Sequence, residues 1–235
     1  MIESAISAGV VLLITVVCSI LIRARYVSKW EARADYGVKG KQWNFLLIAS
    51  VVIGTVLTVV LSGLGMNFMV ATIIGVFAFF LSATGIIDSQ SHLVPKELSS
   101  MALILGLVLG GAGWVTQQYY VSDYLMSHAD QLQFQLVHFG IYMVAISLLF
   151  VVTMFQPVIG FGDIKMFWAF GLFAGSFIFL QQFVFVFMVM FVVMAAMMVR
   201  AMIKAKSWKF SGGLPALPAF AVAFLITTIY WALSF

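Results

Sequence analysis

The sequence predicts an all-α, polytopic membrane protein of about eight transmembrane helices, and three observations carry this prediction. The 235 residues are 64% hydrophobic and only 9% charged, whereas soluble domains carry roughly 25% charged residues. Eight stretches approach the length of about 20 mostly apolar residues that a span needs. All 12 lysines and arginines fall on one face of the resulting topology. The net charge of +4 therefore reflects orientation in the bilayer rather than nucleic-acid binding.

Short polar segments separate the predicted spans, and the least distinct boundary is the pair Gln181 and Gln182 between spans six and seven. A single helix from Ile164 to Val199 would be about 54 Å long at ~1.5 Å per residue. That length exceeds a hydrocarbon core of about 30 Å, so two spans are expected. The eight spans are Ser4–Ile22, Phe45–Leu64, Met66–Ile87, Leu98–Val115, Phe134–Phe155, Ile164–Leu180, Phe183–Val199 and Gly213–Leu233.

Charge predicts the sidedness of these spans. The basic residues lie in the segments that follow spans one, three and seven, and at the start of span six. The longest such segment, from Arg23 to Trp43, is expected to be a solvated loop beside anionic lipid head groups. The opposite face holds Glu3, Asp123 and Asp130. Because basic loops stay in the cytosol, the basic face is predicted to be the cytoplasmic side of the cell membrane, with both termini outside.

Two carboxylates stand at the ends of predicted spans. Asp88 ends span three in GIIDSQSHLVPKEL, and Asp163 opens span six in GFGDIKMF. Two spans separate them, an even number, so both acids must lie at the same face, near the cytosol. An acid beside hydrocarbon is costly unless it faces protein or water, which makes it a functional candidate. Two adjacent carboxyls can share one proton, so that one acts as a base while the other acts as an acid.

Such a pair predicts hydrolysis of the aspartic-protease kind, in which the base activates water and the acid protonates a carbonyl. The only cysteine is Cys18 and no Cys/His cluster is present, so no metal and no cofactor are predicted. Gly160 and Gly162 precede the second acid. Glycine permits backbone angles that other residues avoid, so this pair is expected to let an extended peptide approach closely.

Structural roles for the same residues remain open alternatives. Asp163 could cap the N-terminus of span six, Asp88 could stabilise a turn, and Lys165 could anchor its helix at the membrane interface. Two further glycine pairs are expected to let helices pack closely: Gly106 with Gly110, and Gly171 with Gly175.

Taken together, these residues resemble the type IV prepilin peptidases, within the wider group of intramembrane aspartyl proteases marked by Gly-x-Gly-Asp. The first motif is Asp88–Pro95, with Lys96 where the family usually has Asp or Asn. The second motif is Gly160–Lys165. The resemblance covers roughly Met66–Gly175 and implies that the two aspartates are the catalytic pair of this protease architecture.

A third segment, GGLPALPAF, contains Pro215-Ala216-Leu217, which resembles the Pro-Ala-Leu motif of the presenilin branch. Prolines at the opening of the last span can leave backbone groups unpaired and able to bind a substrate as a strand. An ordinary proline start of the helix is the alternative. The predicted substrate-binding residues are Gly160, Gly162, Lys165, Pro215, Ala216 and Leu217.

The resemblance implies a membrane aspartic endopeptidase that removes the short basic leader of prepilins or pseudopilins at the cytosolic membrane face, with membrane lipid as its surroundings. Residues 1–65 would form two N-terminal spans with a short basic loop, and residues 66–235 a peptidase core of six spans. The loop lacks the paired cysteines of common bacterial members, so methylation of the new N-terminus is not expected. Two alternatives remain: a proton-coupled transporter that uses Asp88 and Asp163, and a membrane scaffold for a pilus or secretion machine.

Overall fold

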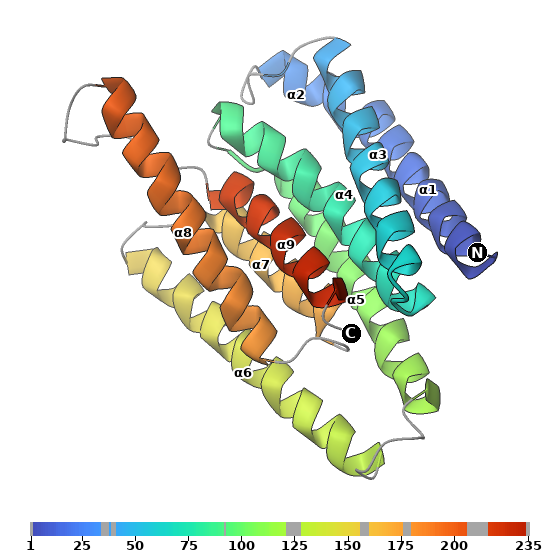
Figure 1. Ribbon diagram of the computed structural model, residues 1–235. Coiled ribbons are helices and arrows are strands. Elements are labelled where there is room, and N and C mark those ends of the chain that lie inside the picture. The colour runs from blue at the N-terminus through green and yellow to red at the C-terminus, as the bar shows by residue number, and fades with distance from the viewer. Residues whose placement is uncertain are drawn as a thin grey trace.

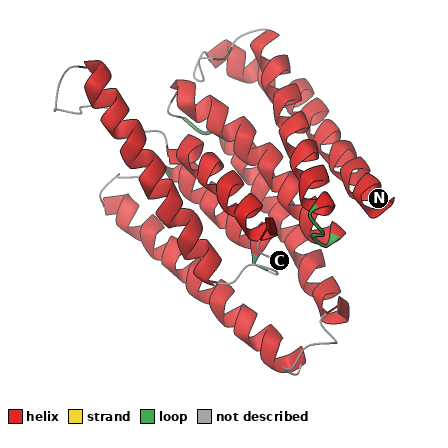
Figure 2. Cartoon of the chain, in the orientation of Figure 1, coloured by secondary structure: helices red, strands yellow, loops and turns green. Residues whose placement is uncertain are grey.

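The computed structural model describes residues 2–33, 38, 41–91, 93–120, 128–155, 160–175, 180–205 and 216–233. Within these residues every regular element is a helix, and short turns or loops join them (Figure 2). In chain order the elements are α1 (Ile2–Ile22), the π-helical turn η1 (Arg23–Val27), α2 (Ser28–Arg33), α3 (Lys41–Gly63), α4 (Phe68–Ser91), α5 (Lys96–Tyr120), α6 (His128–Phe155), α7 (Phe161–Ala174), α8 (Leu180–Ala205) and α9 (Ala216–Leu233).

Seven helices of the described chain are long and apolar enough to cross a membrane. They correspond to seven of the eight predicted spans. The remaining prediction, Ile164–Leu180, corresponds to α7, which has 14 residues and is about 21 Å long at ~1.5 Å per residue. α7 and α8 are separate helices, as predicted. The all-α polytopic membrane protein is therefore confirmed, and one of its helices is shorter than expected.

Successive long helices run in opposite directions through the bundle (Figure 1). The end of α4 and the starts of α7 and α9 consequently lie at the same end of the molecule (Figure 1). The described basic residues belong to segments at this end: η1 and α2 after α1, the starts of α3, α5 and α7, and the end of α8. The structure thus agrees with a single basic end.

The central helix is α4, which packs against α1, α3, α5, α7 and α9. Its sequence is apolar around its whole circumference, which is typical of a buried helix, and Phe77 is only 1% exposed. A Cβ at Gly75 would overlap Thr58 and Gly54 of α3, so these small residues allow the two backbones to meet. Both helices of the predicted N-terminal part, residues 1–65, therefore pack on the core. The division at residue 65 stays a prediction.

Phenylalanine rings hold α7 and α9 against α4. The ring of Phe77 in α4 lies 5.6 Å from Phe170 of α7 and 5.1 Å from Phe224 of α9, measured between centroids. Phe167 of α7 and Phe220 of α9 meet edge-on at 4.9 Å. The edge-to-face pairs Phe77–Phe224 and Phe167–Phe220 each add about 0.5–1.5 kcal/mol beyond the area they bury. These contacts fix the relative positions of the three helix ends that form the candidate site.

Both predicted glycine pairs lie at helix contacts. A Cβ at Gly110 of α5 would overlap the carbonyl of Leu172 in α7, and one at Gly171 of α7 would overlap the ring of Tyr142 in α6. Gly106 likewise contacts α7, and Gly175 likewise contacts α6. The prediction that these glycines permit close packing is confirmed.

The basic segment after α1 was expected to be a solvated loop, but this is not true of the whole segment. Its first part forms η1 and α2, and Trp30 of α2 is only 2% exposed. The Trp30 ring lies 5.8 Å from Tyr26 and 5.1 Å from Trp43, and its Nε1 donates a hydrogen bond to Glu97 Oε2 at 3.3 Å. The expectation is wrong for this part because the aromatic side chains bury it against the starts of α3 and α5. Residues 34–37, 39 and 40 lie outside the described chain.

Candidate active site

Two aspartates lie at the same end of the bundle, where the last turn of α4 approaches the first turn of α7. Asp88 is 3% exposed and Asp163 is 8% exposed. The loop that follows Asp88 contacts the first turn of α7, because a Cβ at Gly162 would overlap Val94, so the two carboxyls lie near each other. The count of spans predicted this placement at one face, and the structure agrees with it.

Asp88 is linked to the last helix of the chain. The backbone N–H of Leu217 donates a hydrogen bond to Asp88 Oδ2 at 3.3 Å. Leu217 is the second residue of α9, and the first amides of a helix have no partner within it. The α9 N-terminus therefore supplies a donor to a buried carboxylate, a favourable arrangement because it satisfies both groups and places negative charge at the positive end of the helix dipole.

Asp163 is tied to the residue that caps its own helix. Gly160 is the N-cap of α7, so Asp163 occupies the third helical position rather than the capping position suggested by the sequence. Its carboxylate folds back toward the cap, since a Cβ at Gly160 would lie 3.3 Å from Asp163 Oδ2. The Gly160 carbonyl in turn accepts from the amides of Asp163 at 3.0 Å and Ile164 at 3.2 Å. These bonds fix the backbone that carries the carboxyl.

The conformational reason given for the two glycines before Asp163 is wrong. Gly160 has φ −67° and ψ 143°, an extended backbone that any residue adopts. Gly162 lies inside α7. Within the described chain the only glycine with positive φ is Gly65. The two glycines of the motif are therefore needed for space rather than for unusual backbone angles.

The space at Gly162 is occupied by the connection between α4 and α5. A Cβ at Gly162 would overlap the side chain of Val94, with Val94 Cγ2 and Cγ1 at 3.1 and 3.2 Å. The loop that follows Asp88 thus lies directly on the first turn of α7, which keeps the two aspartates together. Val94 could not be singled out from the sequence, because an aliphatic loop residue carries no chemical signal. The glycine itself was the one available sign of a close neighbour.

The other predicted site residues occupy the same region where the structure describes them. Ala216 and Leu217 are buried at the start of α9, and Pro215 lies outside the described residues. Lys165 is half-buried on α7. Among described residues the salt bridge found joins Arg23 to Glu31, and Lys165 forms none with either aspartate. Substrate contacts of all these residues stay predictions.

The fold and the site together define a class: a polytopic membrane protein with two buried, adjacent carboxyls at one end of a helical bundle. The model of the type IV leader peptidase family matches residues 75–199. This is more than half of the chain, which therefore belongs to that family. The resemblance to prepilin peptidases is confirmed, and the chain is a multi-pass membrane peptidase of the type IV leader class with prepilin-type substrates.

The matched segment runs from within α4 to α8 and contains both aspartates. α1, α3 and α9 lie outside it, although α9 provides the amide that binds Asp88. No curated protein and no solved structure matches the chain.

Proposed function

We propose that Asp88 and Asp163 are the catalytic acids of an aspartic endopeptidase that removes the leader of prepilin-type proteins at the cytosolic membrane face. The observation that carries this proposal is the neighbouring position of two buried carboxyls inside the matched family segment. Two buried like charges repel each other, so a state in which the pair holds one proton is favoured. That state contains a base and an acid side by side, as hydrolysis of an amide requires.

In this mechanism the ionised carboxylate takes a proton from a water molecule, whose oxygen attacks the carbonyl carbon of the scissile peptide bond. The protonated carboxyl gives its proton to the carbonyl oxygen. Collapse of the tetrahedral intermediate then breaks the C–N bond, and a proton passes to the leaving amine. The hydrogen bond from Leu217 holds the Asp88 carboxyl in place during these steps, and the bonds that the Gly160 carbonyl accepts fix the backbone that carries Asp163.

Orientation follows from charge. The helix ends around the aspartates carry the described lysines and arginines, and basic segments stay in the cytosol. A basic leader would stay there for the same reason, with its apolar helix in the bilayer. The peptide between them would then pass the end of the bundle where the aspartates lie.

Substrate access is proposed at the start of α7. Gly160 is exposed and extended, whereas Asp163, three residues later, is buried. A substrate strand that follows the exposed backbone would reach the carboxyls from the loop side. The residues proposed to contact it are those predicted from the sequence: Gly160, Gly162, Lys165, Pro215, Ala216 and Leu217.

The test is cleavage of a purified prepilin-type substrate with a short basic leader by the full chain in lipid vesicles. Asp88→Asn and Asp163→Asn should each lower kcat by at least about 1,000-fold, while the variants retain the helical content and melting temperature of the parent. Glu31→Gln is the matched control, because Glu31 pairs with Arg23 at the same end of the bundle. Near-normal cleavage by either aspartate variant would refute the aspartic mechanism.

The same assay separates the remaining alternatives. A scaffold would bind the substrate without producing a shorter product, and a transporter would move protons across the vesicle membrane without cleavage. Mass spectrometry of the product identifies the cut bond directly, and a product cut outside the leader junction would contradict the proposed specificity.

A further inference from the structure

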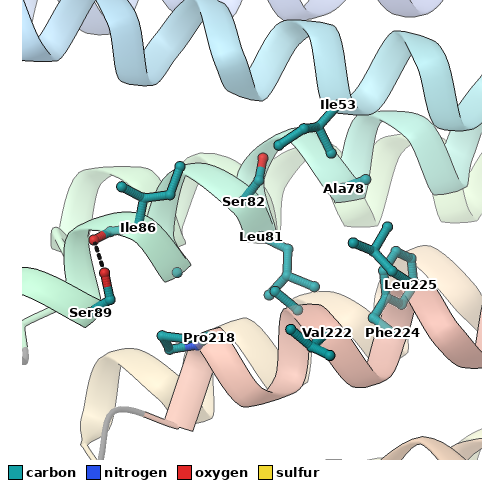
Figure 3. Close-up of a pocket in the computed structure, with 12 residues that line it drawn as sticks. Ile53, Ala78, Leu81, Ser82, Ile86, Ser89, Pro218, Val222, Phe224 and Leu225 are labelled. Atoms are coloured by element: carbon teal, nitrogen blue, oxygen red, sulfur yellow. Dashed lines mark hydrogen bonds between the residues drawn. The ribbon is translucent and has the colours of Figure 1, made fainter.

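A hollow of about 230 Å³ lies between α3, α4 and α9, beside the candidate active site (Figure 3). Its walls are almost entirely apolar. The hydroxyls of Ser82 and Ser89 on α4 donate to carbonyls of their own helix, those of Phe79 and Ile86. An apolar group in the hollow therefore would not bury an unpaired hydroxyl donor of Ser82 or Ser89. The residues that define the walls include Ile53, Leu81, Gly85, Pro218, Ala221 and Val222.

The hollow begins beside the site. Two of its lining residues, Ser89 and Pro218, directly follow Asp88 and Leu217 in the chain. The backbones of α4 and α9 meet between them, because a Cβ at Gly85 would lie 3.6 Å from the Leu217 carbonyl. The near end of the hollow therefore lies beside Asp88, at the contact between α4 and α9. In Figure 3 the side chains of Leu81, Pro218 and Val222 lie between the two helices.

The hollow also faces the surroundings of the bundle. Val222 on its rim is 44% exposed, and α3, α4 and α9 are all long and apolar enough to span a membrane. A group can thus enter sideways from the bilayer. A cavity of about 150 Å³ is enough to hold a benzene ring, so this hollow has room for one large apolar side chain but not for a whole helix.

We propose that this hollow receives a large apolar side chain from the transmembrane helix of the substrate, on the C-terminal side of the cut. The inference rests on the proposed function, since it requires a substrate whose leader stays at the aspartates while its helix lies in the bilayer. The occupant is thus a part of the substrate that is remote from the scissile bond.

The geometry sets the register of this contact. Along α4 the lining runs from Ser89, next to Asp88, back to Ala78, a distance of about 16 Å at ~1.5 Å per residue. A substrate helix that lies alongside would place its third to roughly eleventh residue after the cut against the hollow. Because lipid is as apolar as the substrate, the gain comes from close packing rather than from leaving water.

Photocrosslinking tests the contact without requiring cleavage. A photoreactive amino acid is placed at each of roughly positions three to eleven of a prepilin-type helix, and the substrate is combined with the Asp163→Asn chain in phosphatidylcholine–phosphatidylglycerol vesicles. We expect crosslinks from one or two positions, three or four residues apart, to the segments around Ser82 and Val222. Crosslinks confined to other helices, or to lipid alone, would overturn the proposal.

Size complementarity provides a second readout. Ala221→Phe fills the hollow and should raise KM for the helix-bearing substrate about tenfold. Ala145→Phe makes the same change at an exposed position of α6 and should leave KM within twofold. A substrate with alanine at the crosslinked position should restore KM for Ala221→Phe. A normal KM in Ala221→Phe, or a failure of the smaller substrate to restore it, would refute the inference.

The outcomes separate this inference from the proposed function. Cleavage by the parent chain without crosslinks to the hollow leaves the peptidase intact and overturns the contact. Crosslinks to the hollow with no cleavage by the parent chain support the contact and overturn the proposed catalysis.

Discussion

Gly162→Ala is the most informative single substitution, because the structure gives Gly162 a neighbour inside the protein. The added Cβ would lie 3.1 and 3.2 Å from the two Val94 methyl carbons and closer still to Val94 Cβ. Favourable carbon contacts need about 3.5–4.0 Å, so relief of the contact with Val94 Cβ requires the loop after Asp88 to move by at least about 1 Å. A misplacement of about 1 Å can cost 100-fold in rate. We therefore expect kcat to fall about 10- to 100-fold.

The stability of the same variant reflects two opposing effects. Overpacking costs about 1–3 kcal/mol, whereas alanine is favoured over glycine inside a helix by ~1 kcal/mol. Gly140→Ala in α6 isolates the second effect, because nothing lies within 4 Å of its added Cβ. That control should keep full activity and gain slightly in thermal stability.

The assay is a double-mutant cycle on leader cleavage with Val94→Gly, which removes the whole side chain that the new Cβ meets. If Gly162 is required for the loop, the pair should regain most of the lost kcat, with a coupling free energy of about 1–3 kcal/mol. Equal activity losses for Gly162→Ala with and without Val94→Gly would refute the reasoning. Such a result would assign Gly162 to direct contact with the substrate, as the sequence alone suggested.

Two further predictions address the hydrogen bonds that support the site. Tyr142→Phe removes the buried hydrogen bond of 2.7 Å that the Tyr142 hydroxyl donates to the Phe167 carbonyl. The variant should lower the free energy of unfolding in detergent by about 0.5–1.5 kcal/mol and keep kcat within twofold of the parent. An activity loss at unchanged stability would contradict this structural role. Leu217→Pro removes the backbone N–H that donates a hydrogen bond to the α4 aspartate. Proline is tolerated in the first turn of a helix. The Leu217→Pro variant should cleave the substrate at least about tenfold more slowly than Leu217→Ala, which keeps the N–H. Equal cleavage rates for the two variants would show that catalysis does not use this hydrogen bond.

The global placement of the site could be predicted because it depends only on the order of the spans. An even number of crossings between Asp88 and Asp163 puts both at one face, whatever the tilt or packing of the helices. Apolar length predicted the spans, since a bilayer imposes a minimum length on each. The short helix α7 deviates from this rule. It packs against α4, α5 and α6, and its Ile164, Phe167 and Phe170 are buried by other helices.

The local chemistry around each aspartate could not be predicted in the same way. Charge predicted a solvated segment at Arg23–Trp43, but Trp30 contacts Trp43 and Glu97 from two other helices. The backbone angles of Gly160 are ordinary, so the motif did not reveal why glycine stands there. A Cβ at that position would lie 3.3 Å from Asp163 Oδ2. Contacts between distant segments decide these roles, and a local pattern does not encode them.

The last helix shows why the family match and the structure have to be considered together. α9 lies outside the matched residues 75–199, yet its first turn binds Asp88 and its side chains form one wall of the apolar hollow. The acids can therefore be common to the family while the wall proposed to meet the substrate helix belongs to a segment that the family model does not cover. Exchanging α9 between family members should consequently alter which prepilin helices bind well, as measured by KM. The acid pair should be retained when the exchanged helix keeps the first-turn amide that binds Asp88, because the contact of Phe77 with Phe170 holds α7 on α4 without α9.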